Sequence, residues 1–238
     1  MTSAASIFNI NLRTGTSALI MVVMLATTLL TFPAAQAQTF TVLHTFTGGA
    51  DGSGPGGGGI NSDSAGNLYG VTVSGGVYSP NCLADGAQNG CGTVYKMTRR
   101  NGAWTFNVLY SFDAAGDGYS PDEILAFAAD GSLYGSTFYG PSTVCPGNGC
   151  GTVFRLQPQP TFCTAISCPW KETVLYRFQG YPNDGQQPAF GHLTFDAAAN
   201  LYGTTSWGGP QPFLNSGSIG MLAPLEECRR ERFGRGQA

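Results

Sequence analysis

The sequence predicts an all-β, propeller-like tandem-repeat protein made of three four-stranded antiparallel units, an incomplete or partial propeller. Three observations support this prediction. Similar segments recur three times along the chain, short alternating strands are separated by tight turns, and the chain contains 35 Gly with only 11% charged residues. Many short strands with frequent Gly turns are typical of sandwiches, barrels and propellers, and runs of helix-forming residues are missing after residue 38.

The repeat is clearest in its first strand. Thr-Val-Leu-His-Thr-Phe at 41–46 recurs as Asn-Val-Leu-Tyr-Ser-Phe at 107–112 and Thr-Val-Leu-Tyr-Arg-Phe at 173–178, at equal steps. Each copy is followed by Asp-Gly, a Pro and Leu-Tyr-Gly. Units one and two close with a Gly-Thr-Val-aromatic strand, which is degraded to Gly217-Ser218-Ile219-Gly220 in unit three. The aspartates are Asp51, Asp117 and Asp184, and the Leu-Tyr-Gly motifs lie at 68–70, 133–135 and 201–203. Order and spacing kept three times indicate true repeats.

Within one unit we expect four strands, at 104–112, 124–129, 132–138 and 151–156. Alternation supports the first, in which Trp104, Phe106, Val108, Tyr110 and Phe112 share one face. Asp130-Gly131 predicts a two-residue hairpin within the unit. Asn101-Gly102 predicts a hairpin that joins the closing strand of unit one to the first strand of unit two, so that successive units interlock.

The N-terminal segment predicts export. Arg13 precedes an uncharged apolar run at 17–32 that ends at Pro33, and Ala35-Gln36-Ala37 fits the signal-peptidase rule. A membrane anchor is the alternative, since the run approaches spanning length, but the Pro and the cleavage site favour removal. We therefore expect a signal peptide at 1–37, and a secreted or extracellular protein, with the periplasm and the cell surface as further compartments and no later membrane span.

The remaining chain is expected to hold a repeat domain at 38–224, with units at about 38–98, 99–158 and 159–224, and a charged, disordered tail at 225–238. A formal net charge of −3 argues against a nucleic-acid partner, because such partners need a basic face. Arg99-Arg100 is the only basic pair before the tail, and it is interpreted as a solvated turn.

Six of the seven cysteines fall into close pairs that predict local disulfides. The pairs are Cys82 with Cys91, Cys145 with Cys150, and Cys163 with Cys168. Zinc is the alternative, but zinc sites usually show C-x2-C spacing with added His. The spacings here are C-x8-C, C-x4-C and C-x4-C, and no His lies near these cysteines in the sequence. The first two pairs should staple equivalent loops and the third should close the hairpin between units two and three. Cys228 remains without a partner in this scheme.

The motif order resembles the bacterial GloVer tandem repeat, also called the choice-of-anchor tandem repeat. The residues that carry the resemblance are Val-Leu-Tyr-Ser-Phe, Asp-Gly, Asp-x-x-Gly-Asn-Leu-Tyr-Gly and Gly-Thr-Val-Phe-Arg-Leu, and they cover residues 41 to about 224. The resemblance implies an exported, surface-associated repeat array, and no established activity. The turn at 63–69 is also similar to propeller blades of the NHL kind.

Two features depart from the repeat pattern. The tail after Pro224 is short and charged and has no apolar anchor, so a truncated remnant of a longer repeat protein and an ordinary disordered tail are both open interpretations. Gly220 stands where the other closing strands have Tyr95 and Phe154, and this loss should weaken the last strand.

Candidate catalytic residues are few, and we expect neither a catalytic site nor a cofactor or metal. His44 replaces Tyr110 and Tyr176, so we interpret it as a packing residue. His192 is an outlier, and His44 is the only other His in the sequence, so no set of His residues completes a metal site. Asp122-Glu123 is the one acidic pair within the repeats, but adjacent strand residues point to opposite faces.

Two further patterns are also interpreted as structural. The Asp-Gly sites lack the oxygen-ligand spacing of a calcium loop, and their recurrence indicates turns. The Gly-rich segment at 48–59 lacks the Gly-Lys-Ser/Thr ending of a phosphate loop.

The loops between the Leu-Tyr-Gly strand and the closing strand are the expected place for function. They lie at 74–90, 139–149 and 207–216, and in a propeller they would gather on one face. Four aromatic residues on this face are suited to sugars or peptides: Tyr78, Tyr139, Trp207 and Phe213. We expect a non-catalytic protein that binds a polysaccharide or another surface protein, with self-association through open blade edges. The alternatives are a carbohydrate-active propeller enzyme that uses His192, or a truncated remnant.

Overall fold

The computed structural model describes residues 39–56, 59–82, 90–140, 145, 149–158, 170–188, 191–209 and 218–222, the last of these as backbone only. This part of the chain contains strands and turns and no helix, as the sequence predicts. Chain contacts separate residues 1–42 from residues 43–238, and every strand lies in the second unit. The described residues include no helix that could cross a membrane. The predicted signal peptide and tail lie outside them.

Sheet one is antiparallel, and its central strand is β3 (Leu68–Ser74). Two short strands, β1 (Ser53–Pro55) and β2 (Asn61–Ser62), pair with one edge of β3. On the other edge lie β4 (Thr93–Arg100) and then β5 (Ala103–Ser111).

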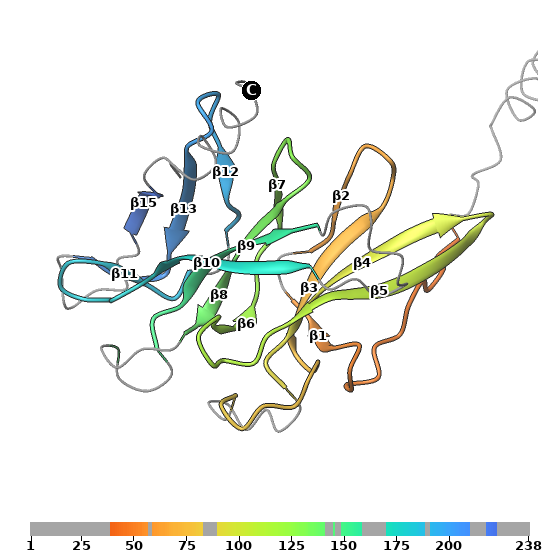
Figure 1. Cartoon of the computed structure of the whole chain (residues 1–238), viewed down its shortest axis with the longest axis horizontal. Helices are drawn as coiled ribbons and strands as arrows, with labels where there is room; N and C mark the ends of the chain where they lie inside the picture. Colours follow the sequence, from red (N-terminus) through yellow and green to blue (C-terminus); the bar gives the residue numbers. More distant parts are fainter. Residues whose placement is uncertain are drawn as a thin grey trace, which may run out of the picture. The chain divides into compact units, whose positions relative to one another are not determined.

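Sheet two repeats this order (Figure 1). Its central strand β8 (Leu133–Tyr139) pairs on one edge with β6 (Tyr119–Pro121) and β7 (Ala126–Phe127). On the other edge lie β9 (Thr152–Gln157) and β10 (Lys171–Arg177).

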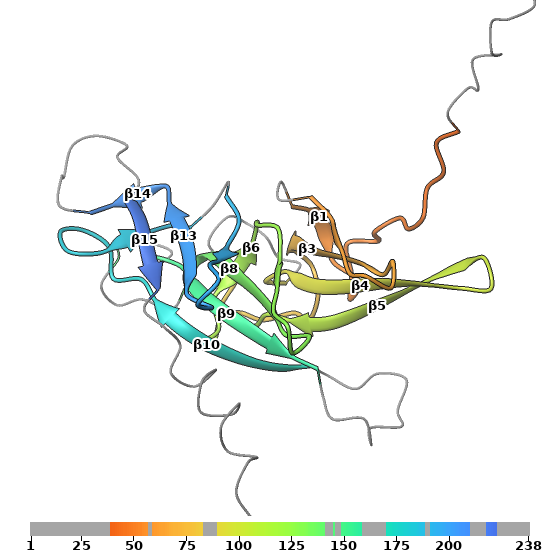
Figure 2. The same cartoon turned by 90° about the horizontal axis from the view of Figure 1, so that it is seen from above.

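The third unit, here called sheet three, consists of two separate ladders. One joins β11 (Gly185–Gln186) to β14 (Trp207–Gly208). The other has the order β12 (Thr194–Phe195), β13 (Leu201–Thr205) and β15 (Ser218–Leu222). Figures 1 and 2 show the three sheets following one another in chain order.

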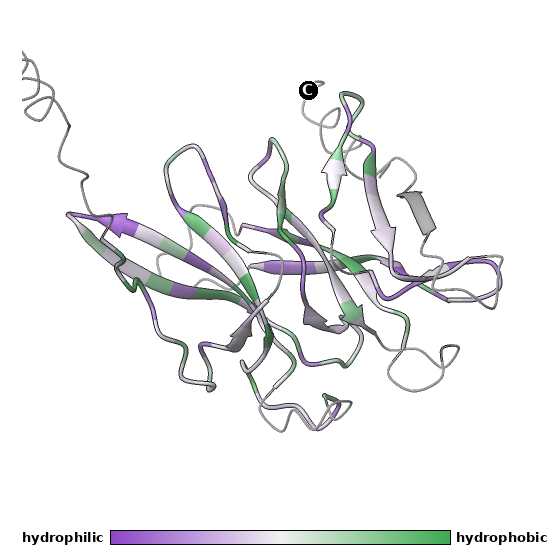
Figure 3. Cartoon of the chain, turned by 180° about the vertical axis from the view of Figure 1, so that it is seen from behind, coloured by the Kyte–Doolittle hydropathy of each residue, from purple (hydrophilic) through white to green (hydrophobic). Residues whose placement is uncertain are grey.

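Each complete sheet takes its outer strand from the next sequence repeat. The predicted hairpin is confirmed: Arg100 pairs with Ala103, and Asn101 (φ 50°) and Gly102 (φ 84°) both have positive φ, as a two-residue turn of this kind requires. This short turn forces β5 to pair with β4, so the strand that opens repeat two belongs to sheet one. The hairpin tip is polar and exposed at Arg99 and Arg100, as predicted (Figure 3).

Two strand predictions need correction. The Asp130-Gly131 turn is a three-residue loop, because Ala128 N–H donates to the Ser132 carbonyl and only Gly131 (φ 83°) has positive φ. The segment 41–46 forms no strand in the described structure, since the sheet that would precede sheet one is not among the described residues.

The glycine of Leu-Tyr-Gly has a packing role in sheets one and two. It pairs with the aromatic residue of the closing strand, Gly70 with Tyr95 and Gly135 with Phe154. A Cβ atom on Gly135 would lie 2.6 Å from Phe154 Cζ, so only glycine leaves room for the ring. In sheet three Gly203 pairs with Gly220, so that strand pair has no ring from the closing strand.

Candidate ligand-binding face

Adjacent sheets are joined by the same backbone contact in both described junctions. Ser120 N–H donates to the Cys91 carbonyl at 2.9 Å, and Gln187 N–H donates to the Cys150 carbonyl at 2.7 Å. Both donors have positive φ, 54° for Ser120 and 53° for Gln187. The recurrence fixes the spacing of neighbouring sheets directly beside the cysteine-containing loops.

Two of the three predicted disulfides are present. Cys82 and Cys91 are joined with a Cα–Cα distance of 5.3 Å, and Cys145 and Cys150 with 5.6 Å. All four side chains are buried. Each bridge closes the loop that ends at the inter-sheet hydrogen bond, so it restrains the carbonyl that joins one sheet to the next. Cys163, Cys168 and Cys228 lie outside the described residues.

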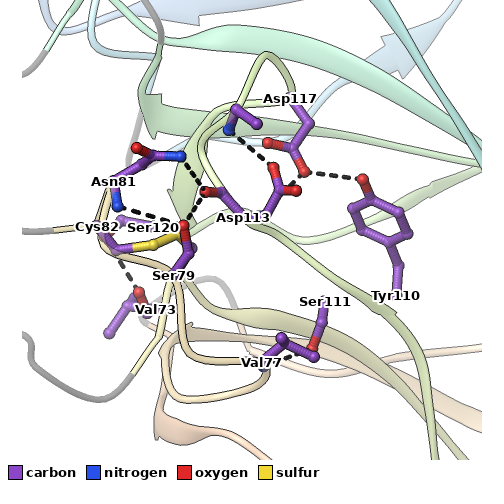
Figure 4. The surroundings of a disulfide bond; sticks show 12 residues. Val73, Val77, Ser79, Asn81, Cys82, Tyr110, Ser111, Asp113, Asp117 and Ser120 are labelled. Carbon is purple, nitrogen blue, oxygen red and sulfur yellow. Dashed lines mark hydrogen bonds between the residues drawn. A yellow bond between two sulfur atoms is a disulfide. The ribbon is translucent and has the colours of Figure 1, made fainter.

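The loop after β3 is tied to the turn that opens the next sheet (Figure 4). Ser79 Oγ donates to the Asp113 carbonyl at 2.5 Å, and Val77 N–H donates to Ser111 Oγ at 3.2 Å. The second loop has a similar neighbour, because a Cβ on Gly180 would lie 2.8 Å from Cys145 Sγ. Each stapled loop therefore shares a surface with the turn before the next Asp-Gly motif.

The predicted aromatic residues differ in exposure. Tyr78 is 65% exposed and Trp207 is 43% exposed. Tyr139 is half-buried and stacks on Tyr119 of the paired strand, with ring centroids 5.0 Å apart. Phe213 lies outside the described residues. The structure therefore presents two exposed rings and one stacked pair at the loop ends of the strands.

Sequence reasoning missed one further exposed ring. Tyr181 is 51% exposed and follows Gly180, the residue that contacts the second disulfide. Its position in the repeat could have indicated a place on the loop face. Tyr181 lies three residues before Asp184, in the turn that corresponds to the Asp113 turn contacted by Ser79.

The Asp-Gly carboxylates are structural, as expected. In each repeat the aspartate accepts a hydrogen bond from the ring of the preceding strand: Tyr110 Oη lies 2.8 Å from Asp117 Oδ2, and Tyr176 Oη lies 3.0 Å from Asp184 Oδ2. In repeat one His44 takes this position beside Asp51, and its ring also stacks on Phe106 with centroids 3.9 Å apart. The interpretation of His44 as a packing residue is confirmed.

A second recurrent carboxylate holds the turn before Leu-Tyr-Gly. Asp63 Oδ2 accepts hydrogen bonds from Asn67 Nδ2 at 2.7 Å and from Tyr69 Oη at 3.0 Å. Asp196 makes the same two contacts with Asn200 and Tyr202. These bonds lower the pKa of both carboxyl groups, and this effect outweighs the opposing effect of burial. Repeat two uses an Arg155–Asp130 ion pair in the corresponding turn.

Glu123 is the most unusual titratable group. It is 3% exposed, and burial raises its pKa to about 7 despite the neighbouring Ser136 hydroxyl. Its Oε2 and Ser136 Oγ are both buried without a hydrogen-bond partner in the described structure. His192 is exposed and its backbone bridges to Ile124, the residue after Glu123. An isolated backbone bridge therefore brings His192 beside the residue that follows Glu123.

A third group of carboxylates, Asp117 and Glu172, lies between the outer strands of sheets one and two. Asp117 is buried, and its Oδ1 and the Oε1 of Glu172 have no hydrogen-bond partner in the described structure. Burial, and then repulsion from Asp113, raise the pKa of Asp117. Burial, and then repulsion from Asp117, raise the pKa of Glu172 to about 7. No cluster of His, Cys, Asp and Glu suited to a metal ion occurs among the described residues.

No family model and no curated protein matches this chain. The class that the fold defines is an all-β protein of successive antiparallel sheets, none of which closes into a barrel.

Proposed function

We propose that this protein is a non-catalytic, exported repeat protein that binds an extracellular polysaccharide through its loop face. The loop face comprises Tyr78, Tyr139, Trp207 and the turn at Tyr181. In this proposal the protein belongs to the class of exported repeat arrays that the GloVer resemblance suggests. The carrying observation is the exposure of Tyr78 in the loop after β3, of Tyr181 in the turn between β10 and β11, and of Trp207 in β14.

Exposed, firmly held aromatic rings suit sugars, because a pyranose presents an apolar face to the ring while its hydroxyl groups bond to nearby polar atoms. Two disulfides and the Ser79–Asp113 bond hold the loops in place, which lowers the entropy cost of binding. The two disulfides agree with an oxidising compartment.

The test is a glycan array followed by calorimetric titration with the best-bound polysaccharide. Trp207→Ala and Tyr78→Ala should each weaken binding at least tenfold. Trp104→Ala is the matched control, because this ring lies on the β4–β5 hairpin away from the loops and should leave binding unchanged. A folded protein that binds no glycan, but captures a surface protein through the same residues, would instead support the second ligand class.

A second candidate function is a carbohydrate-active enzyme. It is favoured by one observation: the buried Glu123 directly precedes Ile124, which forms an isolated backbone bridge with His192. A carboxyl group with a pKa of about 7 suits a general acid at neutral pH. Hydrolysis of a polysaccharide that is lost in both Glu123→Gln and His192→Ala would support it, whereas activity that survives His192→Ala would exclude it.

A further inference from the structure

Among the described residues, sheet three has no outer strand like those that complete the other two sheets. β15 pairs with β13, and no other described strand pairs with it. The corresponding strands β4 and β9 pair on their outer sides with β5 and β10. An edge strand of this kind offers a row of backbone donors and acceptors to an added strand.

The segment 41–46 is the complementary element, because it has the sequence of an outer strand but pairs with no described strand. Its equivalents in repeats two and three are residues 107–112 and 173–178. These segments include the C-terminal parts of the outer strands β5 and β10. The described part of the chain therefore contains one outer-strand sequence that pairs with no described strand, in repeat one, and one strand edge with no described partner, at β15.

Within residues 43–46 the side chains already have the outer-strand arrangement. The His44 and Phe46 rings are 4.9 Å apart at 90°, and the Tyr110 and Phe112 rings are 5.0 Å apart at 82°. Phe46 also meets Tyr95 edge to face at 5.4 Å, as Phe112 meets the corresponding ring of the next sheet at 5.1 Å. Residues 43–46 thus rest on sheet one as the end of β5 rests on sheet two.

The leading side of sheet one exposes apolar residues that are buried in the later sheets. Ile60 is 57% exposed, whereas Leu125 and Leu193, which precede Leu-Tyr-Gly by the same interval, are 1% and 5% exposed. Leu43 is 41% exposed, whereas its equivalent Leu109 is 7% exposed. In repeats two and three a preceding sheet covers the equivalent positions. No described sheet precedes repeat one, so Leu43 and Ile60 remain exposed.

The trailing side of sheet three shows the reverse pattern. Tyr69 and Tyr134 are buried edge to face against Phe127 and Phe195 of the following sheet, at 5.2 and 5.1 Å. Their equivalent Tyr202 is only half-buried. Sheet one therefore exposes one side of the contact that joins neighbouring sheets, and sheet three exposes the other side.

We propose that two copies of this chain associate head to tail, each inserting its segment 41–46 as the outer strand beside β15 of the other copy. A second copy is the occupant that fits, because the same chain supplies both the strand and the edge, and each side of the contact repeats an internal junction. Two reciprocal contacts close a symmetric dimer of six sheets, within the usual four to eight of a propeller.

The internal junctions also set the register. Tyr110 pairs with Val94 and Tyr176 pairs with Val153, each next to a bulge that skips Leu109 or Leu175. Because β15 pairs with β13 as β9 pairs with β8, Ile219 takes the position of Val153. His44 should therefore pair with Ile219 of the other copy, and Leu43 should occupy the bulge.

The experiment is cysteine cross-linking of the purified protein in a Cys228→Ser background, together with light scattering after size exclusion. His44→Cys with Ile219→Cys should give a disulfide-linked dimer, and the non-reducing gel band should disappear after reduction. Thr45→Cys with Ile219→Cys, shifted by one residue, is the matched control and should link at least tenfold less. Wild-type protein should have the mass of a dimer.

A second variant separates association from folding. Thr41→Pro/Val42→Pro removes adjacent strand donors, one of which faces β15, so it should convert the dimer to a monomer with an unchanged cooperative melt. Thr39→Pro, outside the segment, should remain a dimer. A wild-type monomer, a cross-link within one chain or an open series of many copies would each overturn the proposal.

Discussion

His44 Nε2 lies 3.1 Å from Asp51 Oδ2, in the place where the other two repeats have a tyrosine hydroxyl hydrogen-bonded to Asp117 or Asp184. The position therefore requires a flat ring with a polar tip rather than an imidazole in particular. The carboxylates of the Asp-Gly motifs bond the ring near the end of one outer segment to the turn that starts the next sheet. Their role is therefore structural.

Tyr110→Phe should test the strength of this lock. Removing the hydroxyl leaves Asp117, which is 6% exposed and already has one oxygen without a partner, with one bond fewer. We expect a loss of about 1 to 3 kcal/mol in the free energy of unfolding, measured by urea titration. Tyr78→Phe changes an exposed ring and should stay within about 0.5 kcal/mol. Equal effects of the two substitutions would contradict a structural role for the bond.

Glu123→Gln should raise stability at alkaline pH. The folded-state pKa of about 7 lies above the ordinary value of 4.5, so between these pH values the folded state binds more protons than the unfolded state. The contribution of Glu123 is therefore most favourable below pH 4.5 and declines as pH rises toward 7. At pH 8 the glutamine variant should be more stable by on the order of 2 to 3 kcal/mol.

Thermal or urea unfolding from pH 5 to pH 8 measures this effect. Glu172 titrates in the same range, with its pKa also raised to about 7, so the slope should diminish rather than vanish in the variant. Asp130→Asn is a useful comparison, because the Asp130 pKa is lowered and its contribution is lost as pH falls. An unchanged slope in Glu123→Gln would show that Glu123 is ionised in the fold.

Gly135→Ala should be costly because of the ring above it. The added methyl would lie 2.6 Å from Phe154 and 3.0 Å from Leu125, both almost completely buried. We expect about 1 to 3 kcal/mol of destabilisation from overpacking. Gly116→Ala is the control, because its nearest neighbour is 3.9 Å away, and it should be neutral or slightly stabilising. Calorimetric melting of the two variants compares them directly.

Reduction should loosen the loop face before the sheets unfold. The Cys82–Cys91 and Cys145–Cys150 bridges close loops with sequence separations of 9 and 5 residues. Such loops contribute about 2 to 3 kcal/mol each in the chain-entropy treatment. Non-reducing peptide mapping should recover both links and the predicted Cys163–Cys168 link. Links between different pairs would refute the assignment, and hydrogen exchange should show faster opening near Cys91 than in β3 after reduction.

Elements that depend on near neighbours in the chain could be predicted from the sequence. The Asn101-Gly102 hairpin and the two observed disulfides follow from turn chemistry and short spacing, whereas the short strand β6 was not predicted. The role of His44 could also be predicted, because aligning repeats shows which ring it replaces. These features require no knowledge of which sheet lies against which.

Features that depend on neighbouring sheets could not be predicted from the sequence and are visible only in the fold. Glu123 is an ordinary acidic residue in sequence, and its burial to 3% exposure is seen only in the folded chain. Leu43 and Ile60 follow the apolar pattern of their repeats yet are exposed, because no preceding sheet covers them in the described structure. A strand forms only where a partner edge is present, and for this reason segment 41–46 has the sequence of a strand but not its pairing.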